Sequence, residues 1–194
     1  VVTRPFSFEG NLRREVGEMG IKQISQKVDT LITIDNDRLI SSLDAHLSLN
    51  KAFHKADEVL RQGVEGISEI LLAPGLINVD FADVTSVIKH GGQSFMAIGE
   101  GKGHSAANEA VNAVLSNPLF DAPLLGSKGI LINIKSGNNL SLGDVSNIAD
   151  LIKSTSRSQA QIILGVMQDR KWNNRVSITL VATGGGEQVK PKQK

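Results

Sequence analysis

Apolar residues recur along the chain at two spacings, which together predict an α/β protein. Repeats at three- and four-residue steps indicate amphipathic helices, and short runs rich in β-branched residues indicate strands. The helices expected on this basis are Asn11–Val28, Ser48–Leu72, Phe81–Lys89, Ser105–Leu115 and Ser141–Lys153. The expected strands are Val1–Thr3, Thr30–Ile34, Ser94–Ile98, Gly129–Ile134, Gln161–Val166 and Arg175–Thr183.

The longest periodic segment, Ser48–Leu72, predicts a helix about 37 Å long at ~1.5 Å per residue, which is enough to connect two domains. Gly63 and Gly66 lie inside this helix, where each costs about 1 kcal/mol relative to alanine. We therefore expect a neighbouring element to pack closely against these glycines. Pro74 and Gly75 end the helix.

The long helix divides the chain into parts. In residues 1–43, a strand, a helix and a second strand are typical of the last β-α-β unit of a Rossmann-like parallel sheet. We expect the remaining strands of that sheet upstream of Val1, so that the chain is a fragment. Residues 44–73 form the central helix, residues 74–186 a compact α/β domain of about four strands, and residues 187–194 a flexible, basic tail.

Composition and charge narrow the range of functions. Hydrophobic residues make up 40% of the 194 residues, and 21 basic against 20 acidic residues give a net charge of +1, so a nucleic-acid-binding protein is not expected. The chain has no cysteine, its four histidines lack the spacing of a zinc site, and no apolar run approaches the ~20 residues that span a bilayer. We expect a cytoplasmic protein with no metal ligands of its own and no direct membrane insertion.

Candidate chemistry is concentrated in the segment Pro74–Asp83, where Asn78, Asp80 and Asp83 meet at a loop-to-helix junction. Asp80 is well placed as a helix N-cap and Asp83 as the acid three residues later, which is a purely structural interpretation. The same carboxylates can also orient or polarise a water molecule that attacks a nucleotide γ-phosphate. Both interpretations stay open at this point. The chain has no Walker-type or dinucleotide-binding glycine motif beside them, so the junction predicts only half of a site.

A second candidate is the glycine-rich segment Gly99–Ser105, which follows an expected strand and precedes an expected helix. Glycines at a helix start can bind phosphate. Lys102, however, precedes Gly103 rather than serine or threonine, so the Walker pattern is not met. We favour an ordinary strand-to-helix turn.

A third group lies where the first strand, helix and second strand end. Glu9, Arg13 and Asn36 fall at the edge of an α/β sheet, where ligands commonly bind. From the residues alone, we favour solvent-exposed surface positions for all three.

Several segments closely resemble the FtsZ family, the tubulin-like cell-division GTPases. The resemblance is carried by Thr3–Gly10, Leu31–Asp37, Leu49–Asp83, Ser116–Leu119 and Val181–Gly184. It implies the tubulin/FtsZ fold, in which residues 1–43 are the end of a nucleotide-binding domain and residues 74–186 a GTPase-activating domain.

The resemblance also implies roles for the residues singled out above. Asn78, Asp80 and Asp83 would enter the nucleotide site of the next subunit in a head-to-tail filament and activate GTP hydrolysis there. The implied ligands are GTP and GDP, with Mg²⁺ or K⁺ as candidate cations. Division-machinery adaptors would bind a C-terminal peptide that these residues do not include, and the expected location is the division site in the cytoplasm.

Five further residues would contact nucleotide in a protein of this family. Glu9 and Arg13 would touch ribose and phosphate, Asn36 and Asp57 would bind guanine, and Phe53 would lie against the guanine ring. A carboxyl or carboxamide oxygen can accept hydrogen bonds from the ring N–H and amino group of guanine.

One departure from the family is that its Gly-Gly-Gly-Thr-Gly-Thr-Gly phosphate loop is absent from the chain. The chain alone is therefore expected to be inactive, although the protein to which it belongs would be a GTPase. An alternative is a non-catalytic fragment that caps filament ends. A third hypothesis is an independent nucleotide binder that uses Gly99–Gly103.

Overall fold

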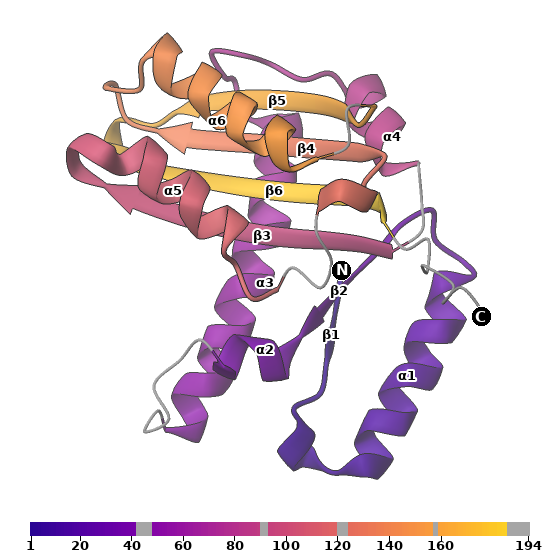
Figure 1. Ribbon diagram of the computed structural model, residues 1–194. Coiled ribbons are helices and arrows are strands. Elements are labelled where there is room, and N and C mark those ends of the chain that lie inside the picture. The colour runs from indigo at the N-terminus through magenta and orange to yellow at the C-terminus, as the bar shows by residue number, and fades with distance from the viewer. Residues whose placement is uncertain (42–47, 90–92, 120–123, 157–158, 186–194) are drawn as a thin grey trace, which may run out of the picture.

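The computed structural model describes residues 1–41, 48–89, 93–119, 124–156 and 159–185 (Figure 1). The basic tail expected at residues 187–194 lies outside these ranges, as do His46 and His90. No helix among the described residues combines the length and the apolar content needed to cross a membrane.

All the elements expected from the sequence are present, with boundaries that differ by a few residues. The helices are α1 (Asn11–Ser25), α2 (Asn36–Ser41), α3 (Leu49–Leu72), α4 (Phe81–Ile88), α5 (Ala106–Leu115) and α6 (Leu142–Thr155). The strands are β1 (Val2–Arg4), β2 (Leu31–Asp35), β3 (Gln93–Lys102), β4 (Gly129–Ser136), β5 (Gln161–Gln168) and β6 (Arg175–Gly185). Short 3-10 turns are η1 (Ser7–Glu9), η2 (Gly103–Ser105), η3 (Leu124–Gly126) and η4 (Arg170–Trp172).

The short helix α2 was not expected, because its first residues resemble a turn. The Asp35 side chain accepts a hydrogen bond from the Asp37 N–H at 3.0 Å. This contact satisfies an amide at the helix start, so the same turn-forming residues begin a helix.

The six strands form a sheet in the order β1-β2-β3-β6-β4-β5. The first three strands run parallel, β6 is antiparallel to β3 and β4, and β4 pairs with β5 in parallel. Within the described residues, two residue pairs, Leu31 with Gln93 and Ile32 with Ser94, join β2 to β3. The strands β3, β6, β4 and β5 therefore make the four-stranded unit expected after the long helix.

Helices cover both faces of this four-stranded unit (Figure 1). On β4, Ile130, Ile132 and Ile134 pack with α5 and α6 in one core, whereas Leu131 packs with residues of α3 and α4 in a second core. A strand that is buried on both faces explains the nearly continuous apolar run of β4.

The central helix α3 lies very close to the sheet, as its two glycines predicted. A Cβ at Gly66 would lie 2.5 Å from Thr179 Oγ1, and one at Gly63 would overlap the thioether of Met96. The Asn133 Nδ2–H group, on β4, donates to the Gly66 carbonyl at 3.1 Å. This close contact fixes the position of α3, and hence of the loop that follows it.

Candidate functional site

The acidic loop, residues 74–80, is fixed to the sheet by main-chain hydrogen bonds. The N–H groups of Leu76 and Ile77 donate to the Val166 carbonyl on β5 at 2.8 and 3.3 Å, and the Val166 N–H donates back to Ile77 at 3.1 Å. Within the loop, the Val79 side chain is buried in the second core. A Cβ at Gly75 would lie 2.5 Å from the Val166 carbonyl oxygen, so this close approach requires glycine. The loop therefore has a defined conformation on a rigid support.

The three polar groups of the acidic loop and α4 are exposed, and their bonding differs. Asp80 Oδ1 caps α4 by accepting from the Asp83 N–H at 2.7 Å, which confirms its expected N-cap position. Asn78 Oδ1 accepts from the Gly75 N–H at 2.8 Å and closes the turn. The Asp83 carboxylate makes no hydrogen bond or ion pair within the described ranges. One Asp80 oxygen and both Asp83 oxygens therefore face solvent.

Large exposed apolar side chains occur in the sequence on both sides of the acidic loop. Leu72, at the end of α3, is 84% exposed, Leu76 is 66% exposed and Phe81, the first residue of α4, is 73% exposed. Exposed apolar groups that flank a polar centre are typical of a protein interaction surface. The acidic loop therefore lies within a surface suited to contact another protein.

A second set of candidate residues gathers where β1 and β2 end. Because the two strands are parallel, their carboxyl ends meet at one edge, and the Ser7 N–H in η1 donates to Asp37 Oδ1 in α2 at 2.8 Å. Glu9 Oε1 accepts from the Phe6 N–H at 2.9 Å. Arg13 Nη1 lies 3.2 Å from Glu9 Oε2, so both residues have defined positions at this edge.

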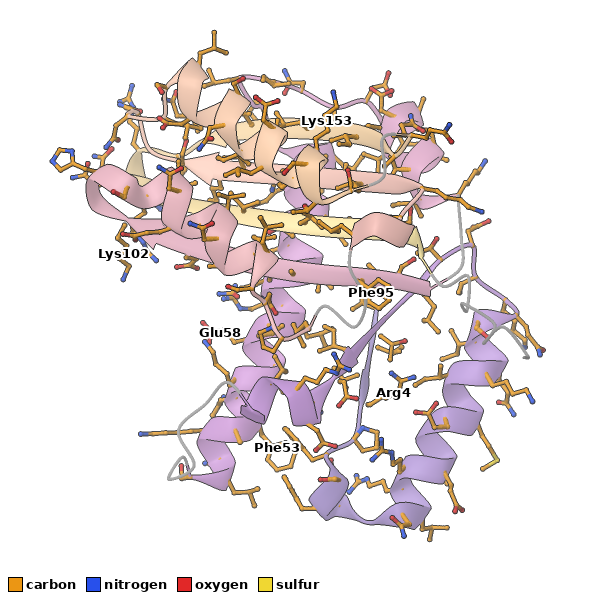
Figure 2. All side chains as sticks on the ribbon, in the orientation of Figure 1. Arg4, Phe53, Glu58, Phe95, Lys102 and Lys153 are labelled. Atoms are coloured by element: carbon orange, nitrogen blue, oxygen red, sulfur yellow. The ribbon has the colours of Figure 1, made fainter. Side chains whose placement is uncertain are left out.

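Phe53, Asp57 and Asn36 extend the same edge. Phe53, near the start of α3, packs edge-on against the rings of Phe6 and Phe8, with centroid distances of 5.3 and 6.3 Å (Figure 2). Asp57 follows one helical turn later and is exposed. Asn36 is only 7% exposed, and its Oδ1 has no hydrogen-bond partner among the described residues. A buried acceptor without a partner is costly, which points to a ligand or water that donates to it.

The two sets of residues lie at opposite ends of α3. The start of α3 lies with α2 and η1, whereas its end leads to the acidic loop and α4 at the other side of the molecule (Figure 1). The 24 residues of α3 span about 36 Å at ~1.5 Å per residue. The acidic loop and the group of Glu9, Arg13 and Asn36 therefore cannot form one site within one molecule.

Comparisons with known proteins show the family and the fold of the chain. The family model "FtsZ family, C-terminal domain" matches residues 92–186. Among curated proteins, "Cell division protein FtsZ" of Pseudomonas putida is 43% identical over 190 residues, which cover 97% of this chain and 48% of the relative. The same protein of Azotobacter vinelandii is 44% identical over 187 residues, covering 96% and 48%. The chain belongs to the FtsZ family. It spans about half the length of the curated relatives it matches.

Solved structures give the same assignment. An FtsZ dimer from M. jannaschii has a TM-score of 0.89 and 36% identity, covering 96% of this chain and 54% of the matched chain. CetZ1 from Haloferax volcanii has a TM-score of 0.74 at 12% identity, covering 96% and 55%, and so shares the fold. The tubulin/FtsZ fold expected from the sequence is thereby confirmed.

In this FtsZ-family chain, the glycine-rich segment is not a loop. β3 continues through Gly101 to Lys102, so the turn to α5 is only η2. A Cβ at Gly99 would overlap the Ala110 carbonyl, and one at Gly101 would overlap the Ala106 carbonyl. These two glycines let α5 pack closely on β3, which explains them without a phosphate ligand. The expected strand ended too early because glycine is unfavourable in strands, and the sequence did not reveal this helix contact.

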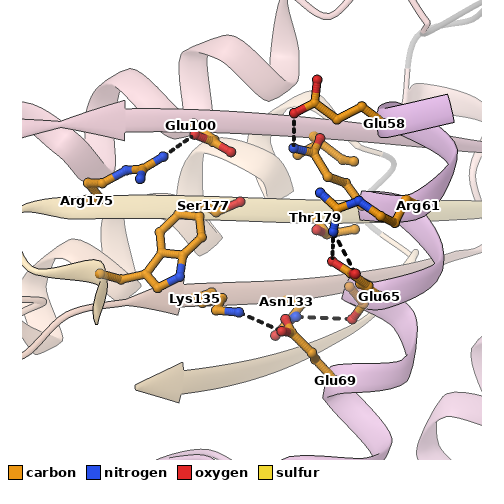
Figure 3. Close-up of a pocket in the computed structure, with 14 residues that line it drawn as sticks. Glu58, Arg61, Glu65, Glu69, Glu100, Asn133, Lys135, Arg175, Ser177 and Thr179 are labelled. Atoms are coloured by element: carbon orange, nitrogen blue, oxygen red, sulfur yellow. Dashed lines mark hydrogen bonds and ion pairs between the residues drawn. The ribbon is translucent and has the colours of Figure 1, made fainter. Parts of the chain in front are cut away.

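A groove between α3 and the sheet contains functional candidates that the sequence reasoning missed (Figure 3). Its volume is about 320 Å³, and its lining includes Glu69, Lys135, Trp172 and Arg175. The available signal was on β4, where polar residues at 133 and 135 interrupt an apolar strand at alternate positions. In the same groove, the hydrogen bond from Lys55 lowers the pKa of Glu58.

The part of the chain that the structure describes has no cluster of three or more histidine, aspartate or glutamate side chains arranged to hold a metal ion. Asp80 and Asp83 are two carboxylates on one exposed junction. Any cation at this position would need further ligands from outside these residues.

Proposed function

We propose that this chain is part of a filament-forming cell-division GTPase, in which it supplies the acidic loop that activates GTP hydrolysis in the neighbouring subunit's nucleotide site. The observation that carries the proposal is the placement of exposed carboxylates at one end of α3 and the nucleotide-type residues at the other. Each copy then offers one half of a site at each end. Such a head-to-tail contact is heterologous and produces open filaments.

At the catalytic half, Asp83 and the free oxygen of Asp80 orient and polarise the water that attacks the γ-phosphate. Asn78 holds the turn through its bond to Gly75, which keeps the carboxylates in place. Because like charges repel, the reacting phosphates need a cation such as Mg²⁺ or K⁺ to offset the two carboxylates. The rigid support on β5 favours this role, since catalysis depends on fixed geometry.

At the nucleotide half, Asn36 presents its Oδ1, which has no partner within the described ranges, to the ring N–H and amino group of guanine. Asp57 accepts from the same edge of the base, and Phe53 lies against the ring. Glu9 and Arg13 contact ribose and phosphate. The loop that cradles the phosphates must come from polypeptide outside these 194 residues, so the chain alone is expected not to hydrolyse GTP.

The surface around the acidic loop supports contact with a second copy. Leu72, Leu76 and Phe81 would be covered by the neighbouring subunit, which removes apolar area from water. The solved M. jannaschii relative is an FtsZ dimer. We place the assembled protein in the cytoplasm at the division site, where adaptors would bind a C-terminal peptide that these residues do not include.

Replacing the carboxylates tests this assignment. In the full-length protein that carries this sequence, Asp80→Ala and Asp83→Ala should each lower the GTP hydrolysis rate by roughly 10²-fold or more, because each removes a group that positions water. Nucleotide affinity should stay nearly unchanged, since guanine and ribose are bound at the other end of α3. Steady-state phosphate release and equilibrium GDP binding measure the two effects.

Asp144→Ala is the matched control. Asp144 occupies in α6 the same position, three residues after the N-cap, that Asp83 occupies in α4. It should leave hydrolysis unchanged. Equal turnover in parent and Asp83→Ala polymers would refute the proposed catalytic role.

A further inference from the structure

A continuous chain of charged and aromatic side chains crosses the groove from α3 to β3. Lys135 Nζ lies 2.6 Å from Glu69 Oε1 and 5.3 Å from the centre of the Trp172 ring. Arg175 stacks on the same ring at 4.6 Å and donates to Glu100 Oε2 at 2.9 Å. These five residues, Glu69, Lys135, Trp172, Arg175 and Glu100, form what we call the groove strap; its charged members are labelled in Figure 3.

The Lys135–Glu69 ion pair of the groove strap joins α3 to the sheet. The two other ion pairs of α3 within the described residues, Lys55–Glu58 and Arg61–Glu65, stay within the helix. Lys135 and Glu69 have side chains only 20% and 27% exposed, so solvent weakens their attraction less than at an open surface. The Trp172 ring adds a cation–π contact that restricts the ammonium group.

A second polar contact from β4 reaches α3 one helical turn earlier. Asn133 is two residues before Lys135 on the same face of the strand, and it donates to the Gly66 carbonyl. Glu69 lies three residues after Gly66 and three residues before Leu72, the last residue of α3. The two contacts therefore fix the final turns of α3 on the sheet, both in their position along the helix axis and in their rotation about it.

We propose that Lys135 is a positioning residue for GTP hydrolysis. By holding Glu69, it fixes the end of α3, and through the acidic loop that follows it sets the position of Asp80 and Asp83 relative to the neighbouring subunit. This inference rests on the proposed function. The acidic loop is fixed to β5 at Val166, and α3 is held on β4 by Lys135 and Asn133. Because β5 pairs with β4, α3 and the acidic loop are anchored to neighbouring strands of the same sheet. If the ion pair is lost, α3 can shift against that support, and a displacement near 1 Å can cost about 10²-fold in rate.

The contact itself can be tested in the 194-residue chain. Trp172 is its only tryptophan, so intrinsic fluorescence reports directly on the groove strap. Lys135→Met should shift the emission by removing the cation over the ring, and Glu69→Gln should shift it as well, although Glu69 makes no ring contact. Unchanged emission in Glu69→Gln would show that Glu69 does not hold Lys135 and would overturn the inference.

The functional test uses the full-length protein. Lys135→Met should lower GTP hydrolysis per polymerised subunit by roughly tenfold, a smaller loss than that for Asp83→Ala because the acids themselves remain. Nucleotide affinity should be unchanged, and Lys135→Arg should restore the rate by keeping the ion pair. Arg61→Met is the matched control, since Arg61 lines the same groove but pairs only within α3.

The outcomes separate the two proposals. If Asp83→Ala lowers hydrolysis but Lys135→Met and Glu69→Gln do not, the positioning role is wrong and the proposed function stands. If Asp83→Ala has no effect, the proposed function is wrong. If Arg61→Met lowers the rate as much as Lys135→Met, the groove charges act non-specifically and the positioning role is also wrong. Urea unfolding identifies any variant that loses the fold. If Lys135→Met does not fold, the hydrolysis rate of Glu69→Gln decides whether the ion pair has the positioning role.

Discussion

At the scale of single residues, Gly66 shows how one missing side chain sets the relation between α3 and the sheet. Besides the short distance to Thr179 Oγ1, a Cβ at this position would lie 2.8 Å from the Thr179 Cγ2 methyl group. Thr179 is buried on β6. The sequence predicted a close neighbour, because glycine inside a helix has a cost, but it did not reveal which strand lies there.

Alanine substitutions at two helical glycines should have opposite effects. Gly66→Ala should lower the free energy of unfolding by about 1–3 kcal/mol, because overlap with Thr179 outweighs the gain in helix propensity. Gly20→Ala in α1 is the control: no atom lies within 4 Å of the added Cβ, so it should gain up to about 1 kcal/mol. Urea unfolding of the 194-residue chain measures both. Stabilisation by Gly66→Ala would contradict the close packing described for α3.

At the scale of elements, α6 has the most complete helix start. The Ser141 side chain accepts from the Asp144 N–H at 3.1 Å, and the Ser141 N–H donates to Asp144 Oδ2 at 2.9 Å. The Ser141 hydroxyl also donates to Asp144 Oδ2 at 2.7 Å. These hydrogen bonds, led by that of the Ser141 side chain, lower the pKa of Asp144 below its ordinary value of 3.8. The charged form of Asp144 is therefore favoured in the folded state.

A pH dependence of stability follows from this lowered pKa. A carboxyl with a lowered folded pKa contributes stability above its unfolded value and loses that contribution as pH falls through the folded value. Asp144→Asn should therefore lower stability by about 0.3–1 kcal/mol at pH 7, and the difference from the parent should shrink below about pH 4. Asp150→Asn, farther along α6 and away from its first turn, is the control and should change the free energy of unfolding little at pH 7. Urea unfolding between pH 7 and 3 checks this, and a constant difference across that range would contradict it.

Periodicity predicted the elements well where burial is one-sided or continuous, as in α3 and β4. It failed where tertiary contacts decide the outcome. β3 extends through Gly99 and Gly101 because α5 packs against their backbone, and α2 begins at Asn36 because the Asp35 side chain accepts from the free Asp37 N–H in its first turn. The strap residue Lys135 was missed for the same reason: its partner Glu69 is 66 residues away in sequence.

At the scale of the whole molecule, α3 separates two groups of candidate site residues. Sequence reasoning singled out candidates in both groups, because a helix cap and strand ends are local features, whereas Phe53 and Asp57 came only from the family resemblance. It could not establish that Asn36 Oδ1 is buried without a partner among the described residues or that Leu72, Leu76 and Phe81 are exposed, since both facts depend on the folded chain. The tests of Asp83 and Lys135 given above address the individual groups, whereas the division of one site between two molecules calls for an experiment with separate polypeptides.

The most direct measurement is GTP hydrolysis by an isolated FtsZ nucleotide-binding half, which carries the phosphate loop, after addition of the 194-residue chain. We expect phosphate release to rise with the concentration of added chain, and to stay at the starting rate when the chain carries both Asp80→Ala and Asp83→Ala. Both chains should bind the nucleotide-binding half equally well. If the parent chain binds but adds no hydrolysis, it is a non-catalytic fragment that only caps filament ends. If the parent chain and the double variant stimulate hydrolysis equally, the acidic loop is not the activating group.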